Sequence, residues 1–112
     1  MSRIFYRTVK HNPPVREDFL SDKDMGKAMP RKPGYVRLWE GLSVFETSEQ
    51  ARAKAIAFPA QGAFIAALAI PDDGRITYGR TGGTAGHHTL WGYPDEMVRC
   101  VASVHLVHRE AR

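Results

Sequence analysis

Apolar residues along this chain fall into patterns typical of β-strands, and one segment has the pattern of an α-helix. Residues 3–9 are rich in aromatic and β-branched side chains, and residues 63–70 are apolar on both alternating faces, as in a strand covered on both sides. Gly41 lies within another such stretch and indicates a bulge or a close approach to the backbone. The predicted strands are residues 3–9, 38–45, 63–70, 76–78, 87–91 and 97–107.

The helix has recognisable signals at both of its ends. Thr47 and Gln50 have the spacing of a capping box, an alanine-rich run follows, and Pro59 ends the helix predicted over residues 47–58. Residues 21–34 are polar and interrupted by glycine and proline, which predicts a long loop. We therefore expect an α+β fold in a single domain, residues 1–112, with helix early and most strands late.

The composition excludes several classes of protein. The chain has 112 residues, enough for one core without disulfides, and its single cysteine, Cys100, favours a reducing compartment. No stretch approaches the ~20 apolar residues of a membrane span, and the first ten residues lack the apolar core of a signal peptide. The resulting expectation is a cytoplasmic protein without membrane contact.

The charge favours an anionic partner without identifying it. The net charge is +4, and more than half of the 16 Lys and Arg residues lie within the first 37 positions. A segment of this kind steers phosphates toward a cleft, or it simply forms a solvated surface. Both interpretations remain open at this point.

Three groups of residues are candidates for chemistry. Arg7 lies inside the first predicted strand, where its guanidinium either extends into solvent or faces a cleft and binds phosphate or an amide. Asp95 and Glu96 precede the last predicted strand, so they lie on the rim of a sheet or form an ordinary turn. His87 and His88 point to opposite faces of a strand and cannot share a metal, so no metal site is expected.

Several segments follow one another in a characteristic order. They are Tyr6-Arg7, Gly41-Leu42-Ser43-Val44-Phe45, Glu46-Thr47-Ser48-Glu49-Gln50-Ala51, Phe64-Ile65-Ala66-Ala67-Leu68 and Pro94-Asp95-Glu96-Met97-Val98. Their order resembles the ADP-ribosyltransferase fold, especially rifampin ADP-ribosyltransferases and small bacterial toxins of the RES-domain kind. In that fold an Arg or His on the first strand is followed by a Gly-ϕ-x-ϕ-Phe/Tyr strand, a capped alanine-rich helix, a buried strand and a strand entered by an acid.

The resemblance implies a cleft between two small antiparallel sheets that holds NAD. It implies an enzyme that cleaves the bond between nicotinamide and ribose, and then transfers ADP-ribose to a macromolecule or hydrolyses NAD. A compact basic protein of this kind suits the toxin of a bacterial toxin–antitoxin pair, with an antitoxin-type protein as its partner.

The resemblance also implies roles for individual residues. Arg7, or His11 in its place, would bind the amide or the phosphates of NAD, and an aromatic ring would stack on nicotinamide. A carboxylate would stabilise the positive charge that develops on the ribose as the bond breaks. The residues implied are Arg7, Ser43, Phe45, Tyr78 and His11 for binding NAD, and Glu96 or Asp95 as the catalytic acid.

Two other functions are consistent with the sequence. One is a small basic ribonuclease or RNA binder, in which His87 or His88 is a general base near an RNA phosphate, acting with Arg80 and Arg99. RNA binding of this kind would depend steeply on salt concentration. The other is a non-enzymatic interaction module on the same fold, with exposed aromatic residues as its anchors.

Overall fold

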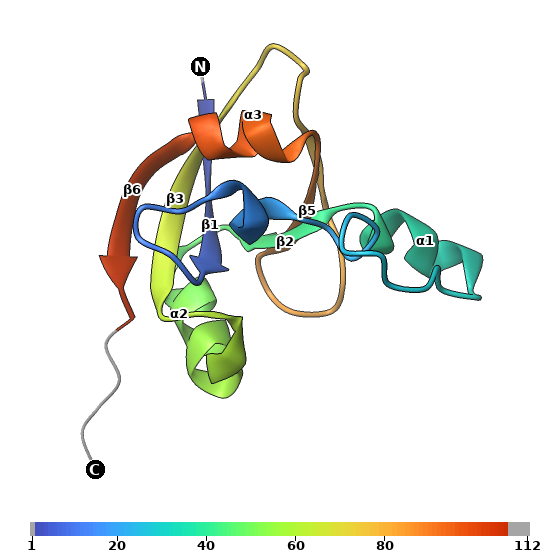
Figure 1. Ribbon diagram of the computed structural model, residues 1–112, viewed down its shortest axis with the longest axis horizontal. Helices are drawn as coiled ribbons and strands as arrows, with labels where there is room; N and C mark the ends of the chain where they lie inside the picture. Colours follow the sequence, from blue (N-terminus) through green and yellow to red (C-terminus); the bar gives the residue numbers. More distant parts are fainter. Residues whose placement is uncertain (1, 108–112) are drawn as a thin grey trace.

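The computed structural model describes residues 2–107 and contains six strands and three α-helices in that range (Figure 1). The strands are β1 (Ser2–Val9), β2 (Leu42–Phe45), β3 (Phe64–Pro71), β4 (Thr77–Arg80), β5 (His87–Trp91) and β6 (Val101–Leu106). The helices are α1 (Pro33–Trp39), α2 (Ser48–Ala57) and α3 (Pro94–Arg99), with two 3₁₀ turns, η1 (Arg16–Phe19) and η2 (Pro59–Gln61). The α+β class is therefore confirmed.

All six strands belong to one antiparallel sheet, in the order β4-β5-β2-β1-β3-β6. The prediction of two small sheets is wrong, because β1 and β2 are hydrogen-bonded neighbours that join the two halves. The junction is narrow: β1 pairs with β3 from Ser2 to Val9, whereas its register with β2 is the single pair Tyr6 and Phe45. Beyond that pair β1 and β2 separate.

The two faces of the sheet are covered by different elements. One face carries the larger core, in which η1 and α3 contribute Phe19 and Met97. The other face is covered by α2, whose Ala51 and Ala55 are fully buried against the sheet. Figure 1 shows α3 and α2 at opposite ends of β1, and α1 extending to the side farthest from β6.

The predicted helix over residues 47–58 is confirmed as α2, together with its capping box. The backbone N–H of Gln50 donates to Thr47 Oγ1, and the backbone N–H of Thr47 donates to Gln50 Oε1, both at 3.2 Å. Gly86 packs directly on this cap: a Cβ at Gly86 would lie 2.0 Å from Gln50 Oε1, and its φ of +74° is one that side chains rarely adopt. The cap therefore fixes the start of β5 relative to α2.

Two predicted strand boundaries are wrong, and both errors involve short helices that begin at a proline. Residues 38–41 do not begin a strand, because α1 extends to Trp39. Residues 97–99 belong to α3, whose N-terminal proline and first-turn acids Asp95 and Glu96 suit a helix start. In a helix of six residues, the helical spacing of apolar positions cannot be distinguished from the alternating spacing of a strand. The turn predicted at 93–95 is likewise replaced by the start of α3.

Among residues 2–107, no helix has the length and the apolar content that crossing a bilayer would require.

Candidate active site

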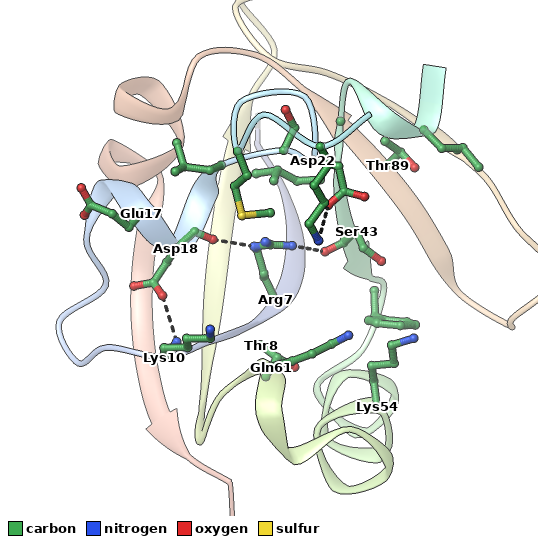
Figure 2. A pocket seen from close by; sticks show the side chains of 18 of the residues that line it. Arg7, Thr8, Lys10, Glu17, Asp18, Asp22, Ser43, Lys54, Gln61 and Thr89 are labelled. Atoms are coloured by element: carbon green, nitrogen blue, oxygen red, sulfur yellow. Dashed lines mark hydrogen bonds and ion pairs between the residues drawn. The ribbon is translucent and has the colours of Figure 1, made fainter. Parts of the chain in front are cut away.

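A cleft of about 850 Å³ opens where β1 and β2 separate (Figure 2). Its walls come from β1, η1 and the following loop, β2, the start of β5, and the α2–η2 segment. Basic and acidic side chains both line it. The basic and imidazole groups are Arg7, Lys10, His11, Lys27, Lys54 and His87, and the carboxylates are Glu17, Asp18 and Asp22.

Arg7 bridges the gap between the separating strands. Its Nε donates to the carbonyl oxygen of Asp18 at 2.9 Å, and its Nη1 donates to the carbonyl oxygen of Ser43 at 2.8 Å (Figure 2). Among the described residues Nη2 has no hydrogen-bond partner, and no carboxylate forms an ion pair with the guanidinium. The side chain therefore faces the cleft, the second of the two orientations that the sequence left open.

The hydrogen bonds that hold Arg7 come from neutral groups. Burial lowers the pKa of Arg7 to about 10, because the loss of hydration outweighs the attraction of the Asp18 and Asp22 carboxylates. At neutral pH the guanidinium is still protonated. Two backbone carbonyls fix its position without neutralising it, so the cleft contains an anchored positive charge available to an anion.

Ser43 and His87 face each other across the paired strands β2 and β5. Ser43 Oγ is hydrogen-bonded to His87 Nε2. His87 Nδ1 lies 2.9 Å from the carbonyl oxygen of Thr81. Because a carbonyl only accepts, Nδ1 carries the proton, and in the neutral ring Nε2 is left to accept the proton of the Ser43 hydroxyl. A hydroxyl, a base and a group that orients the base are thus in line.

Asp18 anchors the wall of the cleft opposite Ser43. Its side chain is buried and accepts from the amides of Lys10 at 2.9 Å and Val15 at 3.0 Å, and it contacts His11 Nδ1 at 3.1 Å. These bonds tie η1 to the end of β1. Since the carbonyl of Asp18 also holds Arg7, the carboxylate fixes the guanidinium indirectly.

Replacing Asp18 with asparagine is expected to lower the free energy of unfolding by about 1–3 kcal/mol. Lys10 N and Val15 N donate to different oxygens of the carboxylate, so one buried amide would face the NH₂ group of the asparagine. Urea denaturation would measure the loss. Asp95→Asn is the matched control, because Asp95 is largely exposed and its pair with Arg16 should contribute less than about 1 kcal/mol. Equal denaturation midpoints for the two variants would contradict this account of η1.

The structure brings four of the sequence-predicted site residues together. Arg7, His11, Ser43 and Phe45 all line the cleft. Phe45 is almost completely buried, and the ring of His87 packs edge-on against it at 5.4 Å. Ser43 and Phe45 of β2 thus both lie at the cleft, with Ser43 exposed at its surface.

The other three predicted residues do not line the cleft. Tyr78 lies on β4 with its ring against Phe5, 5.0 Å away, on the face that carries the larger core. Asp95 pairs with Arg16 at 3.2 Å. Glu96 pairs with Arg99 at 3.1 Å and with Arg75 at 3.6 Å. The two carboxylates expected to act as the acid thus belong to ion pairs on α3.

Sequence reasoning missed the pairing of Ser43 with His87. It also missed that Asp18 ties η1 to the end of β1 and holds Arg7 through its carbonyl. His87 and His88 do point to opposite faces: His87 lines the cleft, whereas His88 is buried against Phe5. The pairing follows from the register of β2 and β5, in which Ser43 opposes Thr89 and Phe45 opposes His87. Nothing in a single sequence specifies that register.

Within residues 2–107 no three His, Cys, Asp or Glu side chains are placed to hold a metal ion. No family model, curated protein or solved structure matches the chain.

Proposed function

We propose that the cleft binds NAD and that this chain cleaves the nicotinamide–ribose bond, passing ADP-ribose to water or to a macromolecule. The observation that carries the proposal is Arg7, a cation that lines the cleft and is fixed by the carbonyls of Asp18 and Ser43. A guanidinium in this state suits the pyrophosphate of NAD, which offers paired oxygens and negative charge. Lys10 and Lys54 add positive charge around it.

The order of elements also supports NAD as the ligand. The sequence resembles ADP-ribosyltransferases in having a basic residue on the first strand, followed by a second strand that leads into a capped, alanine-rich helix. β1, β2 and α2 occur in that order, with Arg7 and Phe45 facing the same cleft. The exposed Ser43 and the ring of His87 offer a polar surface beside Phe45 for nicotinamide and its ribose.

The carboxylates that line the cleft are engaged elsewhere or directed away from Arg7. Asp18 accepts from two backbone amides, and Asp22 pairs with Lys27 at 3.3 Å. Glu17 lies on η1 with its carboxylate turned away from Arg7 (Figure 2). The group best placed to move a proton in the cleft is therefore His87, and we place the reacting bond beside it.

Release of nicotinamide from NAD, measured by chromatography, tests this function. The wild-type chain should release nicotinamide, and His87→Asn should reduce the rate by about 10²-fold or more, the usual contribution of a general base. Glu96→Gln and Asp95→Asn are the matched controls, because both carboxylates lie outside the cleft, and their rates should remain within about twofold of wild type. Loss of release in Glu96→Gln with normal release in His87→Asn would contradict the proposed site.

A protein that releases no nicotinamide, and whose melting temperature NAD does not raise, would not have this function. RNA binding that weakens steeply with salt would then indicate the RNA-acting alternative.

A further inference from the structure

Two serine–histidine contacts occur in the part of the chain that the structure describes, and they differ in one important respect. Ser43 Oγ contacts His87 Nε2 in the cleft, and Ser48 Oγ contacts His105 Nε2 at 3.3 Å outside it. The other nitrogen of His87 is fixed by the carbonyl of Thr81 at 2.9 Å, with the Thr81 hydroxyl 3.0 Å away. No such orienting bond reaches His105 from the described residues.

The ring of His87 is held on three sides. Thr81 orients Nδ1, and Thr81 Oγ1 is itself bonded to Thr89 Oγ1 at 2.6 Å. Phe45 packs against the ring at an interplanar angle of 78°. A Cβ at Gly82 would come within 3.3 Å of Nδ1, so the loop before β5 also lies close to the ring. His87 is thus preorganised to receive a proton from Ser43.

A positive charge lies next to Ser43. Arg7 Nη1 donates to the carbonyl oxygen of Ser43, so the guanidinium is hydrogen-bonded to the backbone of the residue that carries the hydroxyl. Ser43 is exposed on the surface of β2, so a bound molecule can reach it.

We infer that Ser43 is a nucleophile activated by His87, and that it takes up ADP-ribose as a covalent intermediate; the identity of its electrophile rests on the proposed function. Ser43 Oγ forms a bond to C1′ of the nicotinamide ribose while the C1′–N bond breaks. The bonding pair passes to the pyridinium nitrogen, so nicotinamide leaves as a neutral molecule. The hydroxyl proton moves to His87 Nε2.

The second step restores the enzyme. Water or an acceptor hydroxyl attacks C1′, the bond to Ser43 Oγ breaks, and Ser43 recovers its proton from His87, while the proton of the attacking group passes to solvent. Two displacements at C1′ give net retention of configuration, by the logic of retaining glycosidases.

Labelling with a fluorophosphonate probe tests the nucleophile without requiring NAD. Ser43 Oγ would displace fluoride from phosphorus and pass its proton to His87, so peptide mass spectrometry of the wild-type chain should find the phosphonate on Ser43. Ser43→Ala should abolish the label, and His87→Asn should slow it by about 10²-fold. The matched control is Ser48→Ala, which should label at the wild-type rate. An unlabelled Ser43, or equal labelling of Ser43 and Ser48, would overturn the inference.

Nicotinamide release by the same variants separates this inference from the proposed function. If Ser43→Ala releases nicotinamide at the wild-type rate, the cleft cleaves NAD but Ser43 is not its nucleophile, and the inference fails alone. If Ser43 is labelled but the wild-type chain releases no nicotinamide, Ser43 is a nucleophile and NAD is not its substrate. An ADP-ribosyl group found on Ser43 after incubation with NAD would support both.

Discussion

Replacement of Arg7 with lysine is expected to weaken NAD binding by about 10- to 100-fold, the equivalent of one charge-assisted hydrogen bond. Arginine uses Nε and Nη1 to hold the carbonyls of Asp18 and Ser43, so Nη2 is left over for a ligand. The single ammonium of lysine keeps the charge but cannot hold both carbonyls and a pyrophosphate in that planar arrangement. Isothermal titration calorimetry with NAD would measure the change in affinity.

The control for this experiment is Arg99→Lys. Arg99 is exposed on α3, where it pairs with Glu96, and it does not line the cleft. Its replacement should leave the affinity for NAD within about twofold of wild type. Circular dichroism would establish that the Arg7→Lys chain is folded. A folded Arg7→Lys protein that binds NAD as tightly as wild type would remove the central support for the proposed site.

A large loss of stability is expected from Gly41→Ala. A Cβ at Gly41 would lie 2.3 Å from Thr89 Cγ2, 2.8 Å from the Leu90 carbonyl oxygen and 2.8 Å from Trp91 Nε1. The backbone of β5 cannot move aside without disturbing its pairing with β2. We therefore expect the free energy of unfolding to fall by about 3 kcal/mol, at the upper end of the range for overpacking. Urea denaturation would measure it.

Gly34→Ala provides the comparison. Gly34 is exposed near the start of α1, and a Cβ there would meet nothing within 4 Å. Alanine should raise the free energy of unfolding by about 0.5–1 kcal/mol, because it restricts the unfolded chain and favours helix. If Gly41→Ala proved as stable as Gly34→Ala, the close approach of β2 to β5, on which the Ser43–His87 pair depends, would be wrong.

The sequence predicted those elements whose signals are local. The capping box of Thr47 and Gln50, with alanines after it and Pro59 beyond, specified α2 without reference to the rest of the chain. The apolar run over residues 63–70 likewise predicted β3, which lies between β1 and β6. The helices α1 and α3 were missed because each has too few residues for a helical period to show, and because their prolines also fit loops and turns.

The candidate site depended on information that is not local. Arg7 could be singled out because a guanidinium inside a strand is unusual, and its place in the cleft follows from the separation of β1 and β2. His87 could be considered as a base, but its partner Ser43 lies 44 positions earlier and is brought to it by strand register. Asp95 and Glu96 were expected at the mouth of a strand, and α3 carries them away from the cleft instead.

The most direct test of the central claim is an NMR titration of the ¹⁵N-labelled chain with carba-NAD, an analogue that resists cleavage. If the cleft binds NAD, the backbone amides of Arg7, Ser43 and His87 should shift and reach saturation, while those of Asp95 and Glu96 stay in place. Shifts centred on α3, or no shifts at millimolar analogue, would show that the cleft between β1 and β2 does not bind NAD.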